Sequence, residues 1–507
     1  MGAAGRPACA ETRALARTTP PNHTRRWQEN RIQTVFCELS HSGLEGNSNL
    51  VQVRDAAAVK FASKNARFLF FADDSRLAPH TLALMVPALL SSAPVLLPPH
   101  PLADWQVAAA YAVFAASYLV FTLGKLPGMK IDRPGGAIIG AVLMVAFGVI
   151  GASQALRLVD FSTLVLLFSM MLVVGCLRLA GFFDWITEHI VSRLNPRNLL
   201  PVTIFITGAL AAFFVNDIIC LVMVPFALAA ARRMGLKPLP YLLAVATAAN
   251  IGSVATITGN PQNMLIGSVS GLSYRYFLGR LGPVALIGLL LDWALIRLLC
   301  PHEPAPAGAG APAAPPRIHL RQMRKPAIVM ALVLAGFLAG APPAMVAAVG
   351  AALMLITRTR EPRLVYDEVD WGLLVFFIGL FLIVGGAEAA GLTSGLFAAA
   401  GRVNLQNAGV FTAATALVSN IVSNVPAVMV LKSLVPSFHD PRTGWLVLAM
   451  ASTLAGNLTI TGSVANLIVV ERARGEIHIG FWDYSRVGIP VTLLTLAVGW
   501  AWLSWVR

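Results

Sequence analysis

The sequence predicts an all-α integral membrane protein built as an inverted repeat, with about five membrane crossings in each half. The composition supports this fold, because the 507 residues are 57% hydrophobic and only 12% charged, with a mean hydropathy of +0.71. Long apolar runs also follow one another along most of the chain. Finally, two polar interruptions of these runs occur in the first half and recur in the same order in the second.

The more distinctive interruption is the polar loop Thr256-Ile-Thr-Gly-Asn260-Pro-Gln-Asn263. The apolar runs on either side of it are each too short to cross about 30 Å of hydrocarbon. The second half carries a related loop, Thr459-Ile-Thr461-Gly462-Ser463-Val-Ala-Asn466, with Ile460 placed 203 residues after Ile257. Irregular backbone at this depth is tolerated only where it is buried in protein or lines a cavity. Each loop therefore predicts a broken helix, at about 239–270 and 443–471.

The other interruption precedes each loop. It reads Asn216-Asp217 in the first half, and Ser419-Asn420 with Ser423-Asn424 in the second. Residues 199–230 are long enough for two spans, but we favour a re-entrant hairpin with its tip at the polar residues, and a matching hairpin around Asn420–Asn424. Asn420 follows Asn216 by 204 residues, nearly the offset of the loops. Two breaks repeated at one spacing indicate a duplication, which in transporters places the site at the interface of the repeats.

The remaining elements follow from the lengths of the apolar runs. We leave residues 1–84 unassigned, as disordered or upstream of the true start, and residues 85–104 undecided as a span. Further spans are expected at about 105–124, 135–153, 160–180 and 281–300, and then at about 327–340, 342–357, 370–390 and 486–506. The stretches 181–195 and 391–405 are expected at the membrane surface. A Pro- and Ala-rich linker, 301–326, separates the repeats 105–300 and 327–507.

The basic residues predict the orientation. The formal charge of +14 comes from Lys and Arg spread through short loops, so we expect no nucleic-acid partner. Most of them fall on one side of the predicted topology, which the positive-inside rule makes cytoplasmic. The linker is on that side, and an odd number of crossings per half inverts the second half. The five cysteines show no close pair and no metal-ligand spacing, so we expect free thiols and no metal site.

At these breaks the chain resembles the ion transporter superfamily, which includes arsenite/antimonite efflux permeases and divalent anion:sodium symporters. The resemblance covers about residues 105–507 and is carried by Asn216-Asp217 with Pro225, Gly259-Asn-Pro-Gln-Asn263, Ser419-Asn420 with Ser423-Asn424-Val-Pro426, and Gly462 to Asn466. The dicarboxylate symporters of this superfamily have Ser-Asn-Thr at each hairpin tip. Here the tips read Val-Asn-Asp and Ser-Asn-Ile or Ser-Asn-Val. The resemblance therefore favours the arsenite or an uncharacterised anion-permease branch over the dicarboxylate branch.

The candidate site uses the breaks themselves. Unwound backbone offers carbonyl groups to a cation, and half-helix N-termini direct N–H groups at an anion. We expect substrate and ion to be bound by Asn216, Asp217, Thr258, Gly259, Asn260, Asn263, Ser419, Asn420, Ser423, Asn424, Thr461, Gly462, Ser463 and Asn466. Of these, Asn263 and Asn466 should serve equivalent ligands from opposite directions. The alternative is that the Asn side chains only satisfy backbone groups freed by the breaks.

Three carboxylates lie within predicted membrane segments. Asp217 is the strongest functional candidate, because an ionisable group inside the bilayer is costly and by default functional, and it could exchange a proton during transport. Its alternative role is a structural hydrogen bond within the hairpin. We interpret Asp292 and Glu388 as structural or close to a membrane face.

We predict a secondary active permease in the plasma (inner) membrane, not an enzyme, that carries a small inorganic or organic anion with a sodium or proton gradient. The apolar domain has no HExxH, P-loop or Ser/His/Asp pattern. A sodium/proton antiporter of the same fold and a transporter-derived receptor are the alternatives. We expect no cofactor except sodium at the same residues. Symport against antiport and the formation of a homodimer stay open.

The orientation can be tested with introduced cysteines. A cysteine at Ala309 in the linker should react with a membrane-impermeant thiol reagent only after the cells are permeabilised. A cysteine in the 272–280 loop should react in intact cells, because the predicted topology places that loop outside. Labelling at position 309 from outside intact cells would overturn the orientation.

Overall fold

The computed structural model describes residues 101–507, except 125–127, 129, 192–194, 301–319, 357–360 and 507. Among the described residues the regular structure is helical and contains no β-strand. The expectations for residues 1–84, and for all of the linker up to residue 319, lie outside this part. Residues 85–100 lie outside it too, and Asp104 begins the first described helix.

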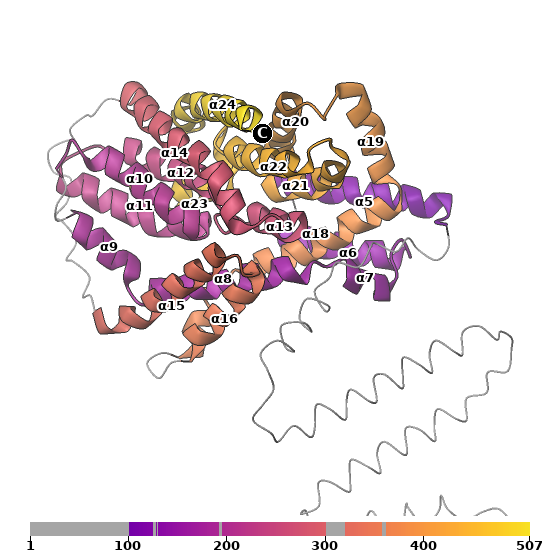
Figure 1. Cartoon of the computed structure of the whole chain (residues 1–507), viewed down its shortest axis with the longest axis horizontal. Coiled ribbons are helices and arrows are strands. Elements are labelled where there is room, and N and C mark those ends of the chain that lie inside the picture. Colours follow the sequence, from indigo (N-terminus) through magenta and orange to yellow (C-terminus); the bar gives the residue numbers. More distant parts are fainter. Residues whose placement is uncertain are drawn as a thin grey trace, which may run out of the picture. The chain divides into compact units, whose positions relative to one another are not determined.

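The first half forms the predicted elements in the predicted order (Figure 1). Its helices are α5 (Asp104–Leu123), α6 (Arg133–Ala146), α7 (Ala152–Leu158), α8 (Phe161–Leu179), α9 (Phe182–Val191), α10 (Leu199–Phe213), α11 (Asn216–Arg233), α12 (Leu239–Ser253), α13 (Pro261–Ser270) and α14 (Tyr274–Leu299). The pair α10 and α11 forms the predicted hairpin, and α12 and α13 form the predicted broken helix.

The second half repeats this order. Its elements are α15 (Leu320–Ala339), α16 (Pro343–Leu355), α17 (Pro362–Tyr366), α18 (Trp371–Ala389), α19 (Leu392–Val403), α20 (Ala408–Val422), α21 (Asn424–Leu431), η2 (Lys432–Ser437), α22 (Pro441–Ala455), η3 (Ile460–Gly462), α23 (Val464–Ala473) and α24 (Phe481–Trp505). In the part of the chain that is described, six helices are long and apolar enough to cross a membrane: α5, α8, α14, α15, α18 and α24.

Two of the predicted spans are shorter than expected. The apolar run 135–153 divides into α6 and α7, because Gly148 adopts a positive φ of 67° between them. The 14 residues of α6 extend only about 21 Å, less than the hydrocarbon thickness of about 30 Å. The run 342–357 likewise forms α16, with 13 residues. A full crossing by these two segments therefore stays a prediction.

The last span of each half is longer than expected. Helix α14 begins at Tyr274 and α24 at Phe481, so each helix has 25 or 26 residues. Most of the predicted 272–280 loop is therefore the first two turns of α14. The Ser273 hydroxyl caps this helix by accepting a hydrogen bond from the Tyr276 amide. A periodicity argument missed this start because Tyr274, Arg275 and Tyr276 are polar or amphipathic.

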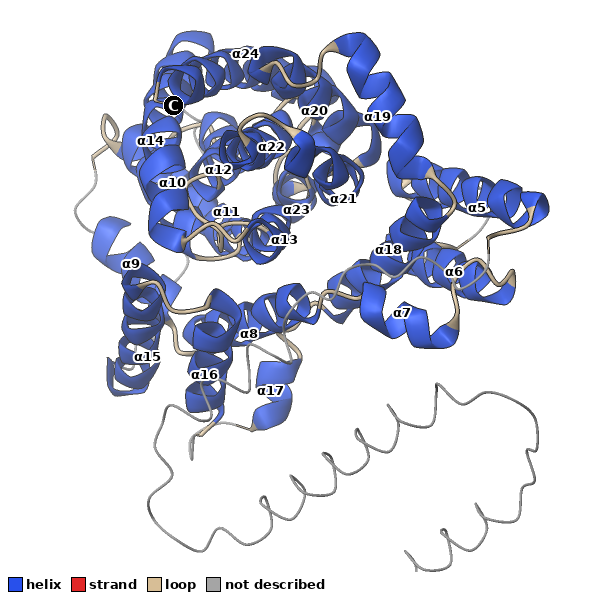
Figure 2. Cartoon of the chain, turned by 45° about the vertical axis from the view of Figure 1, so that its right-hand side comes forward, coloured by secondary structure: helices blue, strands red, loops and turns tan. Residues whose placement is uncertain are grey.

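Hairpins and broken helices are packed together in one bundle. Figure 2 shows α10–α14 and α20–α24 as one group, with α5, α6 and α18 to its right and α8, α15 and α16 below it. Within the bundle α10 packs on α12, α20 on α22, and α14 on α24. Outside it α8 packs on α16 and α18 on α6. Since α6 and α8 occupy the same places in the first half as α16 and α18 in the second, these two contacts are equivalent.

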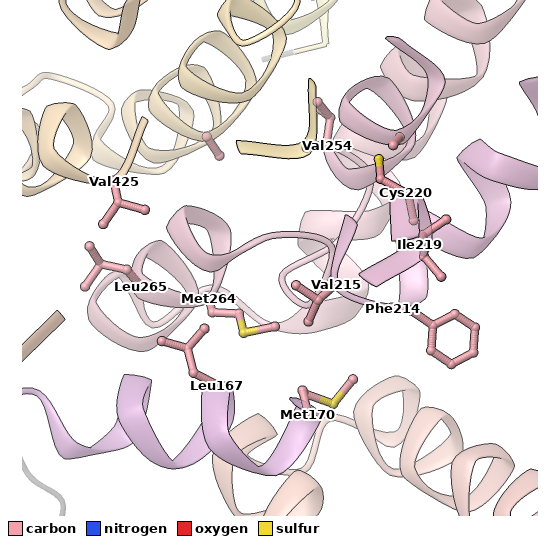
Figure 3. Close-up of a cluster of buried hydrophobic side chains, with 14 of the residues drawn as sticks. Leu167, Met170, Phe214, Val215, Ile219, Cys220, Val254, Met264, Leu265 and Val425 are labelled. Carbon is pink, nitrogen blue, oxygen red and sulfur yellow. The ribbon is translucent and has the colours of Figure 1, made fainter. Parts of the chain in front are cut away.

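Close backbone contact and apolar packing fix the depth of the first break. A Cβ atom on Gly252 of α12 would lie 2.1 Å from the Gly208 carbonyl oxygen of α10, so only small residues permit this approach. Buried Met264 of α13 faces Leu167 of α8, and buried Leu265 faces Val425 of α21 (Figure 3). The loop that precedes α13 is thereby held inside the protein.

Candidate functional site

Both loops are closed by an asparagine side chain that pairs with unwound backbone. The Asn263 Nδ2 group donates to the carbonyl oxygens of Ser253 and Thr256, both at 3.1 Å. The Asn466 Nδ2 group donates to those of Gly456 and Thr459, at 2.7 and 3.0 Å. The second set follows the first by 203 residues at each position. The two asparagines are thus equivalent, but their amide groups bind the loops themselves.

Each second half-helix begins with a side-chain cap. The Asn260 side-chain oxygen accepts a hydrogen bond from the backbone N–H of Asn263 at 2.9 Å. Pro261 occupies the first helical position of α13. Ser463 accepts from the Ala465 amide at 3.3 Å at the start of α23. Asn260 and Ser463 occupy equivalent positions in the two halves, and each caps the half-helix that follows it.

The two loops contact each other through one residue from each preceding helix. Asn250 of α12 donates to Asn466 Oδ1 at 3.0 Å and accepts from the Ser463 hydroxyl at 3.0 Å. Its counterpart in α22 is Thr453, 203 residues later, which donates to Asn263 Oδ1 at 3.4 Å and accepts from Asn260 at 3.1 Å. Each half thus contacts the loop of the other half in the same way.

Each hairpin sets an asparagine against the glycine of a loop. The backbone N–H of Asn216 donates to the Gly259 carbonyl oxygen at 3.0 Å. The Asn420 side-chain oxygen lies 3.1 Å from the place that a Cβ atom on Gly462 would take. The Oδ1 atoms of both asparagines are buried and accept no hydrogen bond within the described part of the chain. One unpaired acceptor is therefore present beside each loop.

The second hairpin turns differently from the first. Helix α20 runs through Asn420 to Val422, so Asn424 begins the second arm, as Asn216 does in the first hairpin. Ser423 forms the tip with φ 77° and ψ 158°, a conformation that costs a non-glycine residue about 1–3 kcal/mol. Ser419 braces this turn by donating to Asn424 Oδ1 at 2.9 Å.

Three of the predicted residues lie apart from this network. Thr258 is buried, but its hydroxyl contacts the Tyr274 hydroxyl at 3.0 Å. Thr461 is exposed, and within the described residues its hydroxyl forms a hydrogen bond only with the Thr459 hydroxyl, at 3.4 Å. Asp217 is half-buried in the first turn of α11, and its carboxylate makes no hydrogen bond within the described residues. The hydrogen bond that would have made Asp217 structural is therefore not seen there.

Sequence reasoning missed the residues that join the halves. Asn250 and Thr453 lie seven residues before the paired isoleucines Ile257 and Ile460. Asn457 was missed too; it accepts from Asn250 at 2.8 Å. A polar residue inside an apolar run, repeated at the offset of the loops, was the available signal.

The network consists of neutral groups. Its donors and acceptors are amides, hydroxyls and backbone groups. Among the described residues no group of three His, Cys, Asp or Glu side chains could hold a metal ion. Glu388 accepts a hydrogen bond from Ser433 at 2.5 Å, which agrees with a structural role.

The chain matches known proteins over most of its length. The family model described as "Citrate transporter" matches residues 118–455. A silicon efflux transporter of rice is 30% identical over 463 residues, covering 76% of this chain and 95% of the relative. An uncharacterized transporter of Mycobacterium tuberculosis is 30% identical over 427 residues, 78% of this chain and 98% of the relative.

Two more distant proteins are also similar. The putative transporter arsB of Dictyostelium discoideum is 24% identical over 489 residues, covering 73% of this chain and 87% of the relative. The solved structure of the YdaH transporter of Alcanivorax borkumensis is 16% identical, with a TM-score of 0.48, and the match covers 79% of this chain and 97% of that chain.

The equivalence of the two loops can be tested by removing each asparagine. Asn263→Ala and Asn466→Ala should both lower the melting temperature of the purified protein in detergent. Each change leaves two buried carbonyl groups without a donor, at about 1–3 kcal/mol for each group. Thr461→Ala, which removes an exposed hydroxyl, should melt like the wild type. A lower melting temperature in only one of the two asparagine variants would contradict the equivalence of the two loops.

Proposed function

Because the chain belongs to the citrate transporter family, we propose that it is a secondary active permease for a small anion or oxyanion, driven by a sodium or proton gradient. The family assignment makes the protein a multi-pass membrane transporter rather than an enzyme. The network around the two loops is proposed as its binding site. The orientation, the substrate and the coupling ion belong to the proposal.

Contacts between the halves support an inverted arrangement. Trp502 Nε1 donates to the Arg280 carbonyl oxygen at 2.9 Å, and a Cβ atom on Gly288 would lie 3.4 Å from Thr495. Helices α14 and α24, which close the two halves, therefore run antiparallel, as an inversion requires. Arg232 and Glu476 form an ion pair between the ends of α11 and α23, both predicted to be cytoplasmic.

The unpaired Oδ1 atoms of Asn216 and Asn420 are the observation that carries the proposal. A buried acceptor without a donor is costly, and a ligand that supplies a cation or a hydroxyl proton would remove that cost. Sodium can bind such an oxygen directly. A protonated oxyacid can donate to it while its other oxygens accept from amide groups. Relatives named for silicon efflux and after arsB agree with a small hydroxylated oxyacid as substrate.

A screen of candidate solutes tests this function. Purified protein should be stabilised by the transported solute among arsenite, silicic acid, sulfate, phosphate, citrate and dicarboxylates, added with and without sodium. A solute at 100 times its dissociation constant stabilises by about 2.7 kcal/mol. Asn216→Ala should weaken this effect, and Thr461→Ala should not.

Transport in proteoliposomes then separates the alternatives. Accumulation of the stabilising solute on a sodium or proton gradient supports the permease. Sodium-driven proton movement without solute transport would replace it with the antiporter. A solute that stabilises the protein but never accumulates would indicate a receptor.

Asp217 is proposed as a coupling group at the first tip. Asp217→Asn keeps the size of the side chain and removes its charge, so a carrier that uses this proton should lose gradient-driven accumulation. Solute binding and solute exchange should remain, since they need no net proton transfer. Normal accumulation by Asp217→Asn at both acid and neutral pH would make the residue structural.

A further inference from the structure

A second carboxylate, Asp292 of α14, is completely buried beneath the candidate site. Its Oδ2 atom lies 2.9 Å from the Thr247 hydroxyl of α12. Its Oδ1 atom has no hydrogen-bond partner among the described residues. An isolated ionised carboxylate is costly in such surroundings unless it is paired or becomes neutral.

The facing helix supplies further unpaired oxygens. Helices α14 and α24 run antiparallel, with Gly288 level with Thr495. Asp292 lies one turn after Gly288, so it is level with Thr492, which lies one turn before Thr495. The hydroxyl groups of Tyr484, Ser485 and Thr492 on α24 are buried and lack a partner among the described residues. The carboxylate thus lies next to a helix with several spare hydroxyl groups.

The Thr247 hydroxyl distinguishes two states of Asp292. Its oxygen lies 2.9 Å from the Leu243 carbonyl oxygen as well as 2.9 Å from Asp292 Oδ2. A hydroxyl has a single hydrogen and can donate to only one of them. The Leu243 carbonyl cannot donate, so both bonds form together only when a protonated Asp292 donates to Thr247. When Asp292 is ionised, the Thr247 hydroxyl can bond to the carboxylate only by donating to it. The Leu243 carbonyl oxygen then loses its hydrogen bond from this hydroxyl.

We propose that Asp292 binds and releases a proton during the transport cycle, with Thr247 as the group that responds to its protonation. The carboxylic acid gives its proton to water and becomes a carboxylate, and it regains a proton from water when the cycle reverses. A short path joins it to the loops, because Asn457 donates to the Thr247 carbonyl oxygen at 3.2 Å and accepts from Asn250. This inference rests on the proposed function and assigns a proton to its coupling step.

The groups that face Asp292 leave its charge uncompensated. The buried titratable groups on the helices that pack against α14 are Tyr484 on α24 and Tyr241 on α12. None of the Lys, Arg or His residues in the described part forms an ion pair with Asp292. Neutralisation by a proton is therefore the local means of avoiding a buried charge.

Infrared difference spectroscopy of the reconstituted protein tests the proton directly, without a substrate. The spectrum at acid pH should contain a carboxylic C=O band that is absent at alkaline pH, so the difference between the two spectra should show it. Asp292→Asn should remove one component of this band, and Glu388→Gln should leave that component in place. A band unchanged in Asp292→Asn would overturn the proposal.

Variants of Thr247 keep the test decisive if Asp292→Asn does not fold. Thr247→Val removes the hydroxyl and should shift the frequency of the Asp292 component, whereas Thr247→Ser should restore it. An unshifted component in Thr247→Val would contradict the role of this hydroxyl.

Transport links the proton to the cycle. With arsenite as probe, Asp292→Asn should retain exchange but lose accumulation on a proton gradient, and proton-driven accumulation at the wild-type level would overturn the proposal. If wild-type protein transports none of the solutes screened, the proposed function fails, while the infrared titration still decides whether Asp292 binds a proton.

Discussion

The structure depends on how the backbone groups freed by two breaks are satisfied inside a membrane. Peptide groups that leave a helix at this depth find no water, so they need partners within the protein. Asn263 and Asn466 supply these partners by each binding two carbonyl groups of their own loop. The loops can then remain unwound between their half-helices.

The two loops are stabilised by equivalent asparagine hydrogen bonds, and each loop is also bound by a residue of the other half. Asn250 and Thr453 extend from the helices before the breaks and contact the loop of the opposite half. Each of these contacts has its counterpart one repeat away. The hydrogen-bond network is therefore formed by both halves together, and neither half contains it alone. This arrangement agrees with a transporter, in which a single site is approached from two sides of the membrane.

In the proposed mechanism, the groups that bind the solute are distinct from the groups that couple transport to a gradient. Amides, hydroxyls and carbonyls can accept either a hydroxylated solute or sodium without a fixed charge at the centre. The carboxylates lie at the margins of this network, Asp217 at a hairpin tip and Asp292 beneath α12. Asn457 joins the second of them to the loops. A change of charge at the margin could thus alter hydrogen bonds at the centre without placing a charge beside the solute.

The sequence by itself determined the class of fold, the order of the elements and the positions of both loops, because a polar break in an apolar run is visible without knowledge of the neighbours. The duplication followed from the constant offset between Ile257 and Ile460. The tertiary structure decided which polar residues meet. Thr258 and Thr461 share a motif position, yet one is buried beside Tyr274 and the other is exposed. Asn250 and Asp292 lay within apolar helices with no local motif. Asn250 meets Ser463 and Asn466 of the other half, and Asp292 meets Thr247 of a neighbouring helix in its own half. These contacts come from packing between segments distant in the chain, which local sequence does not encode.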